Sequence, residues 1–519
     1  MKKVLISALI FAMMFAFGTS CQRENLDGVI RVVVYDRGTD GGRTNPTRNN
    51  WTDWIQENFY AESGYNVQFV PVPRAQEEQA QVNLMAAGNP PDIMKTFSLE
   101  NITNWGEMGG LFDMAPYIDT HLYNLRELLG YDPVLPGRYF IHRNKNAQTG
   151  QVFSIPGRRV NVARFNTFIR EDWLEALNLP IPSNAEEFFN TMVAFRDRIP
   201  AVLGVDNVIP FIMTQDVRWT AGAIAESFID PDISTRDLWI NSIVDRFFLV
   251  PGYKEGIRFL NRMYNNGLIG RDFPLYADDE IYNNLIKSGV VGAFAHNWDQ
   301  IFRESDRILS DLQEIVPTAR LIPIDTFSSS GVNISYDAEA LYFFIPAGSR
   351  NPHAAMSYLN WLSRFEIYNF LQIGPEGIVH EMVDGVPRIN PVASDGWIQN
   401  SSMNIDYTPM LNGLFLGTEE ASIRAMASAY PWPAEMIMEA YRTAMINARP
   451  IPVVATTAPL RAAGPLSRTL IDMSIAFVIR AIRAPEGDFD TEWNTGITNW
   501  LTSGAEAIRR EREELYIDP

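Results

Sequence analysis

The hydrophobic pattern of the first hundred residues alternates between strand and helix. Residues 29–36 are β-branched and almost continuously apolar, which is typical of a strand buried on both faces of a parallel sheet. Apolar positions at helical spacing follow over 51–62, and then a second apolar run covers 67–70. A further helix from about 74 to 88 leads into a third strand near residue 92. This alternation predicts an α/β sheet that binds ligands at the carboxyl ends of its strands.

The second half of the chain repeats this pattern with more helix. Amphipathic spacing predicts helices at 186–198, 253–266 and 352–365, and an apolar strand at 341–346. From Met436 onward the pattern is mostly helical. We find no tandem repeat and no low-complexity linker.

Composition describes a packed protein with several domains. The chain has 519 residues, of which 46% are hydrophobic and 20% are charged. Its 43 Lys and Arg face 62 Asp and Glu, a formal net charge of −19. Because nucleic-acid binding needs clustered positive charge, this balance argues against a nucleic-acid partner.

The N-terminus has the pattern of a secretory signal. Lys2 and Lys3 precede an apolar run at 4–17, which is too short to span a membrane, and the only cysteine follows at Cys21. This arrangement resembles a bacterial lipoprotein, so we expect a signal peptide at 1–20, a lipidated Cys21 and a tether over 21–28. The mature protein is then a body anchored on the extracytoplasmic face of a membrane. A single cysteine also excludes an internal disulfide and a thiolate zinc site.

No catalytic motif is present in the sequence. His-Glu-x-x-His, Gly-x-Ser-x-Gly, Walker and Gly-x-Gly-x-x-Gly patterns are absent, and the five histidines are dispersed. Asp278-Asp279-Glu280 lacks the spacing of a calcium loop and is better interpreted as an acidic helix N-terminus. We therefore expect no cofactor and no metal site. With 62 carboxylates, a glycosidase pair stays open as an alternative.

Several sequence blocks, in order along the chain, resemble those of family 1 extracellular solute-binding proteins. The block Met-Ala-Ala-Gly-Asn-Pro-Pro-Asp-Ile at 85–93 is similar to the family signature "aaG-x-x-PDi". The later blocks lie at 153–156, 169–182, 253–269, 288–294, 358–362 and 374–377. The resemblance implies a non-enzymatic, lipid-anchored monomer that captures a carbohydrate and delivers it to the permease of an ABC importer. The length of the chain places it with the family members that bind oligosaccharides.

The same resemblance implies the two-lobed periplasmic-binding-protein fold. Each lobe is expected to be a mainly parallel sheet flanked by helices, with a helix-rich C-terminus. The first lobe is expected to comprise 29–160 with 338–395, and the second 161–337 with 396–519. Loops at the strand ends of both sheets would then face each other across one cleft.

A sugar site needs flat aromatic rings for the C–H faces and polar groups for the hydroxyl rim. Candidates are aromatic residues that stand beside polar residues directly after predicted strands. For the first lobe they are Tyr35, Asp36, Arg37 and Phe97, and for the second they are Asp216, Arg218, Trp219, Asn297 and Trp298. Net charge disfavours polyanionic sugars, although a local pair of Arg37 and Arg218 could override it.

Other conspicuous residues are interpreted as structural. Trp173 and Trp361 lie on predicted helices and are expected in the core, and Arg170 with Asp172 is expected to form an ion pair near the hinge. Two alternatives to transport stay open: a secreted carbohydrate-cleaving enzyme with an unrecognised carboxylate pair, and a sensor subunit that delivers its ligand to a membrane receptor.

Overall fold

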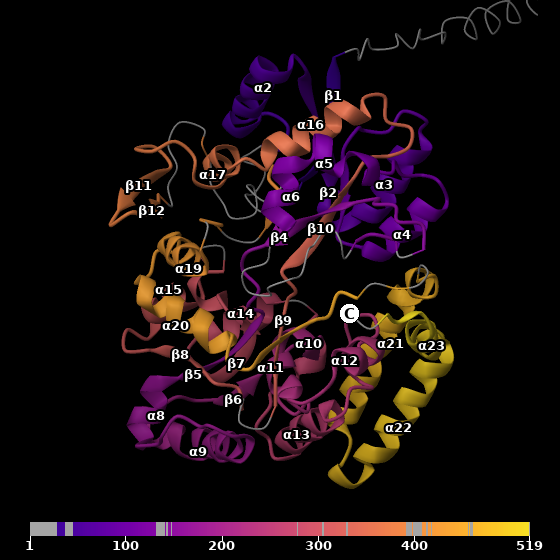
Figure 1. The fold of residues 1–519 in the computed structure, drawn as a ribbon. Helices are drawn as coiled ribbons and strands as arrows, with labels where there is room; N and C mark the ends of the chain where they lie inside the picture. Colours follow the sequence, from indigo (N-terminus) through magenta and orange to yellow (C-terminus); the bar gives the residue numbers. More distant parts are fainter. Residues whose placement is uncertain are drawn as a thin grey trace, which may run out of the picture.

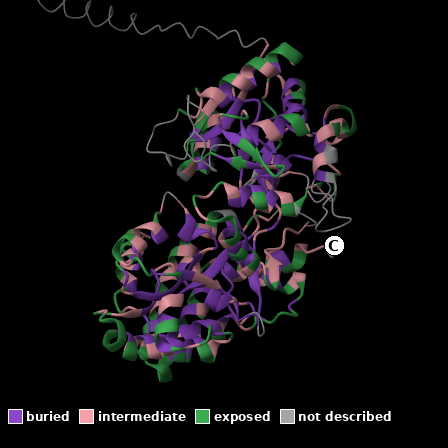
Figure 2. Ribbon diagram, turned by 90° about the vertical axis from the view of Figure 1, so that its left-hand side faces the viewer, coloured by how far each residue is buried: buried purple, intermediate pink, exposed green. Residues whose placement is uncertain are grey.

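The protein folds into two lobes. The computed structural model describes residues 28–36, 45–130, 141, 144–146, 148–277, 279–303, 306–327, 331–390, 397, 407–411, 414–416, 418–454, 456 and 460–517. Figure 1 shows the N-terminal strands and helices together with α16 (Pro352–Leu362) in an upper lobe, which we call the first lobe. The middle of the chain and the C-terminal helices form the lower, second lobe. Buried residues fill the interior of each lobe (Figure 2).

The first lobe begins with the predicted βαβ unit. Strands β1 (Val29–Asp36) and β2 (Asn66–Pro73) pair in parallel, and α2 (Asn50–Ser63) connects them. The helix ends at Gly64, whose φ of 75° lies in the left-handed region that glycine adopts without a steric cost. The prediction of strand, helix and strand over 29–70 is therefore confirmed.

A second sheet completes the first lobe. Its strands lie in the order β13 (Met410–Leu411), β4 (Ile155–Arg159), β10 (Glu339–Phe344) and β3 (Met94–Thr96). One buried hydrophobic cluster joins both sheets and the helices of this lobe. These helices are α3 (Glu77–Ala86), α4 (Leu99–Glu107), α5 (Ile118–His121), α6 (Tyr123–Gly130), α16 and α17 (Phe365–Ile373).

The second lobe is built on a four-stranded sheet. Its strands lie in the order β6 (Ile209–Ile212), β7 (Val291–Asn297), β5 (Phe165–Arg170) and β8 (Leu321–Ile324). Two buried clusters, which include Trp173 and Phe294, lie around this sheet. The helices of this lobe up to residue 444 are α8 (Glu171–Leu177), α9 (Ala185–Leu203), α10 (Val217–Thr220), α11 (Gly222–Glu226), α12 (Thr235–Asn241), α13 (Tyr253–Asn265), α14 (Asp279–Lys287), α15 (Ile308–Ile315) and α20 (Ala434–Ala444).

Smaller elements join or flank the two lobes. A hairpin of β11 (His380–Val383) and β12 (Val386–Ile389) lies near α19 (Glu419–Ser428), and β9 (Asn333–Ser335) pairs in parallel with β14 (Ala448–Pro450). Within the described part of the chain, no helix is both long and apolar enough to cross a membrane.

The sheets are mixed rather than mainly parallel, which corrects one detail of the prediction. β10 runs antiparallel to both β3 and β4, and β5 runs antiparallel to both β7 and β8. The reason lies in the chain path. β5 and β10 each enter their sheet from the other lobe, through residues 160–164 and 336–338, so they start at the edge where strands such as β3 and β7 end.

Three helices form the C-terminal part of the second lobe: α21 (Ala463–Arg483), α22 (Phe489–Trp500) and α23 (Glu506–Leu515). The Asn261 amide donates to the backbone oxygens of Ala481, Ile482 and Ala484, which fastens the end of α21 to α13. The helix-rich C-terminus is thus confirmed. This part of the chain also contacts the first lobe: Arg461, just before α21, donates to Glu107 of α4 at 2.7 Å, and Arg512 of α23 lies 3.8 Å from Glu100 of α4.

Other sequence predictions can be compared with these elements. Trp173 and Trp361 are buried, as predicted. Arg170 and Asp172 form the predicted ion pair, with 2.6 Å between Nη2 and Oδ2. Its position near the hinge was wrong, because β5 starts at the hinge and Arg170 ends the strand, about 17 Å further along at roughly 3.3 Å per residue.

Candidate ligand-binding site

The strand registers show which edges of the two lobes face each other. In the first lobe Thr96, at the end of β3, lies opposite Tyr342, so the first residues of β10 extend beyond the end of β3. In the second lobe Asn297, at the end of β7, lies opposite Phe165 at the start of β5. β5 and β10 start where the chain enters from the other lobe, and they run antiparallel to β7 and β3. The carboxyl ends of β3 and β7 therefore lie at the sheet edges that are next to the other lobe. We call them the interlobe edges.

At the first interlobe edge, two predicted residues come together. The rings of Tyr35 and Phe97 are stacked, with centroids 6.2 Å apart and an interplanar angle of 17°. The Arg74 guanidinium lies 4.4 Å from the Phe97 centroid and 5.4 Å from that of Tyr35. Arg74 follows directly after β2, so the ends of three neighbouring strands contribute to this group. The sequence analysis missed Arg74, although its place after an apolar strand was a signal.

Burial limits what this group can offer. The Tyr35 side chain is buried and its hydroxyl donates to the Lys95 carbonyl at 2.8 Å, whereas Phe97 is half-buried and Asp36 is exposed. The Lys95 ammonium lies 5.0 Å from the Tyr35 centroid. Arg37 lies outside the described residues. Phe97 and Arg74 therefore present the more accessible surface here.

The predicted residues that follow β7 lie in the packed part of the second lobe. Trp298 is 2% exposed and meets Tyr441 edge to face, with centroids 5.3 Å apart. With its amide oriented to match donors to acceptors, Asn297 accepts from both terminal nitrogens of Arg303. The Trp298 ring thus contacts the core in this conformation.

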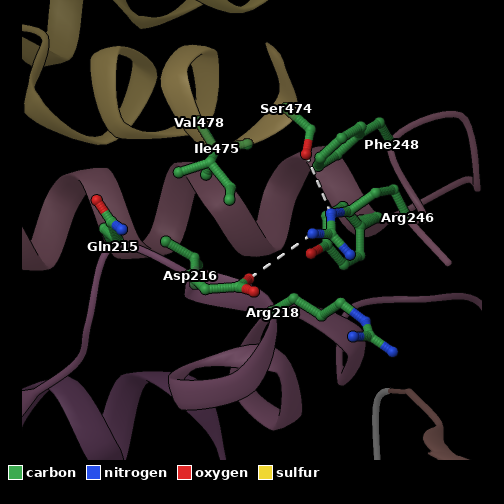
Figure 3. Close-up of a pocket in the computed structure, with 10 residues that line it drawn as sticks. Gln215, Asp216, Arg218, Arg246, Phe248, Ser474, Ile475 and Val478 are labelled. Atoms are coloured by element: carbon green, nitrogen blue, oxygen red, sulfur yellow. Dashed lines mark hydrogen bonds and ion pairs between the residues drawn. The ribbon is translucent and has the colours of Figure 1, made fainter. Parts of the chain in front are cut away.

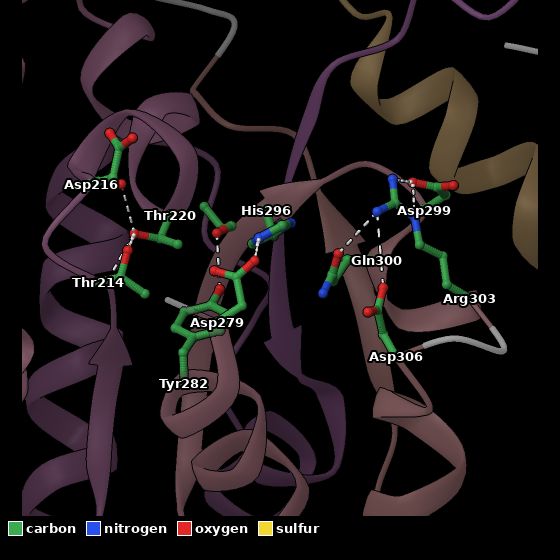
Figure 4. A network of polar contacts seen from close by, with 11 residues as sticks. Thr214, Asp216, Thr220, Asp279, Tyr282, His296, Asp299, Gln300, Arg303 and Asp306 are labelled. Carbon is green, nitrogen blue, oxygen red and sulfur yellow. Dashed lines mark hydrogen bonds and ion pairs between the residues drawn. The ribbon is translucent and has the colours of Figure 1, made fainter. Parts of the chain in front are cut away.

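A polar network includes His296 and Asp299, which are the neighbours of these two residues in the chain (Figure 4). Arg303 donates to Asp299 at 2.6 Å, and Tyr430 donates to the other oxygen of Asp299 at 2.7 Å. His296 contacts Asp279 at 3.2 Å, and this hydrogen bond lowers the pKa of the Asp279 carboxyl against the opposing effect of burial.

The residues that the structure describes hold no group of three or more candidate metal ligands, so we assign no metal centre to this network. Asp279 begins α14, in agreement with the acidic helix N-terminus predicted there, and Asp278 lies outside the described residues.

The predicted residues that follow β6 lie together beside a pocket. Trp219 is half-buried and meets Phe165 edge to face at 5.5 Å, and the Arg218 guanidinium lies 4.6 Å from the Trp219 ring centre. Asp216 and Arg218 line a small open pocket of about 250 Å³ between this loop and α21 (Figure 3). Its lining residues are Gln215, Asp216, Val217, Arg218, Arg246, Phe248, Tyr253, Ser474, Ile475 and Val478.

Three arginines and three carboxylates form an ionic cluster behind this pocket. Arg164 donates to Glu226 at 3.2 Å, Arg218 pairs with Asp245, and Arg246 lies 3.9 Å from Asp216. Only Asp216 and Arg218 of these six were predicted. Glu226 lies on the neighbouring helix α11, whereas Arg164, Asp245 and Arg246 come from other segments of the chain, and nothing in their local sequence distinguishes these four residues.

Burial and like charge shift the protonation equilibria of this cluster. Burial, together with the like charges of the nearby Arg164 and Arg246, lowers the pKa of Arg218 to about 9. Burial raises the pKa of Glu226 to about 7, although Arg164 and Arg218 oppose that shift. The cluster therefore holds cations that their neighbours destabilise and a carboxylate that is partly protonated near neutral pH.

Backbone strain marks the same place. Val244 and Asp245 have φ values of 47° and 55°, in the left-handed region that side chains, and above all β-branched ones, rarely adopt. Such strain persists only where surrounding contacts hold it, and it concentrates at functional sites. Here it presents the Asp245 carboxylate to Arg218 and, at 3.7 Å, to Arg164.

Tyr336 adds an aromatic surface from the second interlobe connection. It is half-buried, and the guanidinium carbons of Arg159 and Arg164 lie 4.3 and 5.8 Å from its ring centre. Arg159 ends β4 and Arg164 precedes β5, so both flank the first connection. Sequence reasoning missed Tyr336 because it does not follow a strand of the lobe core.

Comparisons with known proteins agree with this architecture. No protein-family model matches the chain. The polygalacturonan/rhamnogalacturonan-binding protein YtcQ of Bacillus subtilis is 23% identical over 231 residues, which cover 44% of this chain and 43% of YtcQ. The fructooligosaccharide ABC transporter substrate-binding protein FusA of Streptococcus pneumoniae is 21% identical over 264 residues, 47% of this chain and 46% of FusA. The chain thus spans about half the length of these curated relatives.

A solved structure extends the comparison over nearly the whole chain. The crystal structure of an extracellular solute-binding protein from Bifidobacterium longum subsp. infantis covers 94% of this chain and 97% of its own, with a TM-score of 0.64 and 15% sequence identity. At this identity the likeness concerns the fold. Together with the sequence relatives it confirms the resemblance that the sequence blocks indicate: the chain has the two-lobed α/β fold of the extracellular solute-binding proteins.

Proposed function

We propose that this protein captures a carbohydrate between its two lobes and delivers it to an ABC importer. The observation that carries the proposal is the pairing of the interlobe edges. Each edge gathers aromatic rings and arginines at strand ends, and short connections at 160–164 and 336–338 join the lobes next to them. We keep the lobe boundaries of the sequence analysis, apart from residues 407–411, which we assign to the first lobe because β13 pairs with β4 there.

The residue types at both edges suit a sugar. Phe97 on the first lobe, with Trp219 and Tyr336 on the second side, offers partly exposed rings for C–H faces. Arg74 and Arg218 offer planar donors that can bind vicinal oxygens in a bidentate manner. The proposed set of ligand contacts therefore keeps Arg218, Trp219 and Phe97 from the sequence prediction and adds Arg74 and Tyr336.

The relatives support a saccharide but leave its type open. YtcQ is named for polygalacturonan and rhamnogalacturonan, whereas FusA is named for fructooligosaccharides. The first names include an acidic polymer, and the second describes neutral chains. A membrane anchor at Cys21, release to a permease and action as a monomer are further parts of this proposal.

The proposal includes binding without cleavage. Within the described ionic cluster, Glu226 is 1% exposed and pairs with Arg164, and Asp245 pairs with Arg218. These contacts leave the carboxylates of the cluster poorly placed to act together on a glycosidic bond. A glycosidase needs an acid and a base or nucleophile on either side of that bond.

A thermal-shift screen over neutral and acidic oligosaccharides tests the function. A saturating ligand should raise the melting temperature by mass action, and chromatography after incubation should recover the sugar intact. Failure of every oligosaccharide to shift the melting temperature would argue against saccharide capture. Conversion of a sugar into shorter products would instead favour the enzymatic alternative.

A further inference from the structure

We infer that the second lobe recognises an acidic sugar, whose carboxylate binds the guanidinium of Arg218 beside the pocket. This inference rests on the proposed function and specifies its substrate class. It depends on hydrogen-bond donors of the arginines that have no acceptor, on the balance of charge in the ionic cluster, and on the access of Arg218 to the pocket.

The arginines of the ionic cluster keep hydrogen-bond donors unused. Nε of Arg218, and both Nε and Nη2 of Arg164, are buried without a hydrogen-bond acceptor. Nη2 of Arg164 lies 3.7 Å from the Asp245 carboxylate, which is an ion pair but too long for a hydrogen bond. A buried charged donor without an acceptor is costly, so these groups favour a ligand that supplies acceptor oxygens.

The charge balance favours an anionic acceptor over a neutral one. Arg164, Arg218 and Arg246 lie close enough to destabilise one another, although the whole chain carries a net charge of −19. Asp216 and Asp245 face these arginines, whereas the third carboxyl group, that of Glu226, keeps its proton up to a pH of about 7. The cluster is therefore locally short of negative charge, which a ligand carboxylate would supply.

Access selects Arg218 among the three arginines. Its side chain is 12% exposed and lines the pocket, whereas the side chains of Arg164 and Arg246 are 0% and 6% exposed. Figure 3 shows the Arg218 guanidinium pointing away from the ion pair of Asp216 and Arg246. Trp219 lies directly against Arg218, so a sugar ring on Trp219 would carry its carboxylate within reach of the guanidinium.

Matched saccharides test this assignment. Oligogalacturonate, oligoalginate and oligoglucuronate fragments are compared by calorimetry with their carboxyl-reduced counterparts, which have the same backbones but no charge, and with fructooligosaccharides. We expect a carboxylated fragment to bind at least tenfold more tightly than its reduced counterpart. Its affinity should also fall as salt rises, because screening weakens the ionic contact.

Three variants assign the effect to Arg218. Arg218→Gln should remove about tenfold or more of the affinity for the carboxylated sugar and little of that for a neutral one. The double variant Arg218→Gln/Asp245→Asn removes the ion pair without changing net charge, and it should lose acidic-sugar binding too. Arg468→Gln, on the exposed face of α21, removes one positive charge elsewhere in the same lobe and should bind as the parent does.

The outcomes separate this inference from the proposed function. Equal binding of carboxylated and reduced sugars, or tight binding of neutral fructooligosaccharides alone, would overturn the acidic-sugar assignment and keep carbohydrate capture. Unchanged acidic-sugar affinity in the folded Arg218→Gln variant would overturn the role of Arg218. Absence of binding by every saccharide would count against the proposed function itself.

Discussion

Alanine variants of Trp219 and Trp298 distinguish a ligand-facing ring from a core ring. Trp298 is 2% exposed and contacts Tyr430 and Tyr441, with ring centroids 6.4 and 5.3 Å away. Truncation of such a buried aromatic costs about 3–5 kcal/mol of the free energy of unfolding. At roughly 2–4 °C per kcal/mol for a domain of this size, Trp298→Ala should lower the melting temperature by about 6–20 °C.

Trp219 should respond differently because its ring is only half-buried. Its ring meets the Phe165 ring edge to face, with centroids 5.5 Å apart. We expect Trp219→Ala to cost about 1–2 kcal/mol of stability from lost burial and the edge-to-face contact. Loss of a stacking surface should also weaken binding of the best sugar by several-fold to tenfold, whereas Trp219→Phe should retain most of the affinity.

Scanning calorimetry and titration calorimetry on the same preparations check both expectations. Folded Trp298→Ala should lose much of its stability and bind the sugar almost normally. Trp219→Ala should keep most of its stability and bind the sugar more weakly. If Trp298→Ala melts with the parent but loses binding, the Trp298 ring must reach the ligand in another conformation. A Trp219→Ala variant that binds normally would remove Trp219 from the site.

Two further predictions concern the anchor and the pH response. Cys21→Ala should release the protein from membranes or leave the signal uncleaved, which fractionation and mass spectrometry measure, and unchanged membrane association would refute lipidation at Cys21. Because burial raises the folded-state pKa of Glu226 to about 7, its proton stabilises the folded protein fully below the ordinary glutamate pKa, and this stabilisation is lost progressively as pH rises from there to about 7. Glu226→Gln, which resembles the protonated form, should therefore gain stability relative to the parent between pH 5 and 8, and a difference in melting temperature that stays constant with pH would contradict the shifted pKa.

The sequence predicted those parts of the fold that local patterns encode. The βαβ unit at 29–73 and the helices α9 and α13 follow from the spacing of apolar residues. α9 continues through Pro200 to Leu203, since a proline in the last turn removes only one backbone hydrogen bond, and the Gly204 N–H donates to the Pro200 carbonyl where the helix ends. Strand direction was not predictable in this way, since it depends on where β5 and β10 enter from the other lobe.

The candidate site was predictable only where it follows strands of one lobe. Tyr35 and Phe97 come together because β1 and β3 are neighbours, and Asp216, Arg218 and Trp219 share one loop. Arg246 and Ser474, by contrast, are 228 residues apart and meet only in the folded chain, where Nε and Oγ are 3.1 Å apart. Trp298 shares the local pattern of Trp219, so only its tertiary packing against α20 distinguishes a core ring from an accessible one.

Small-angle X-ray scattering, with and without the saccharide that gives the largest thermal shift, tests ligand capture between the lobes most directly. Binding at both interlobe edges should select a closed arrangement, so the radius of gyration should fall on saturation. The Arg218→Gln variant, measured at the same sugar concentration, should show a smaller fall. Identical scattering curves for the free and the saturated protein would contradict capture by closure of the two lobes.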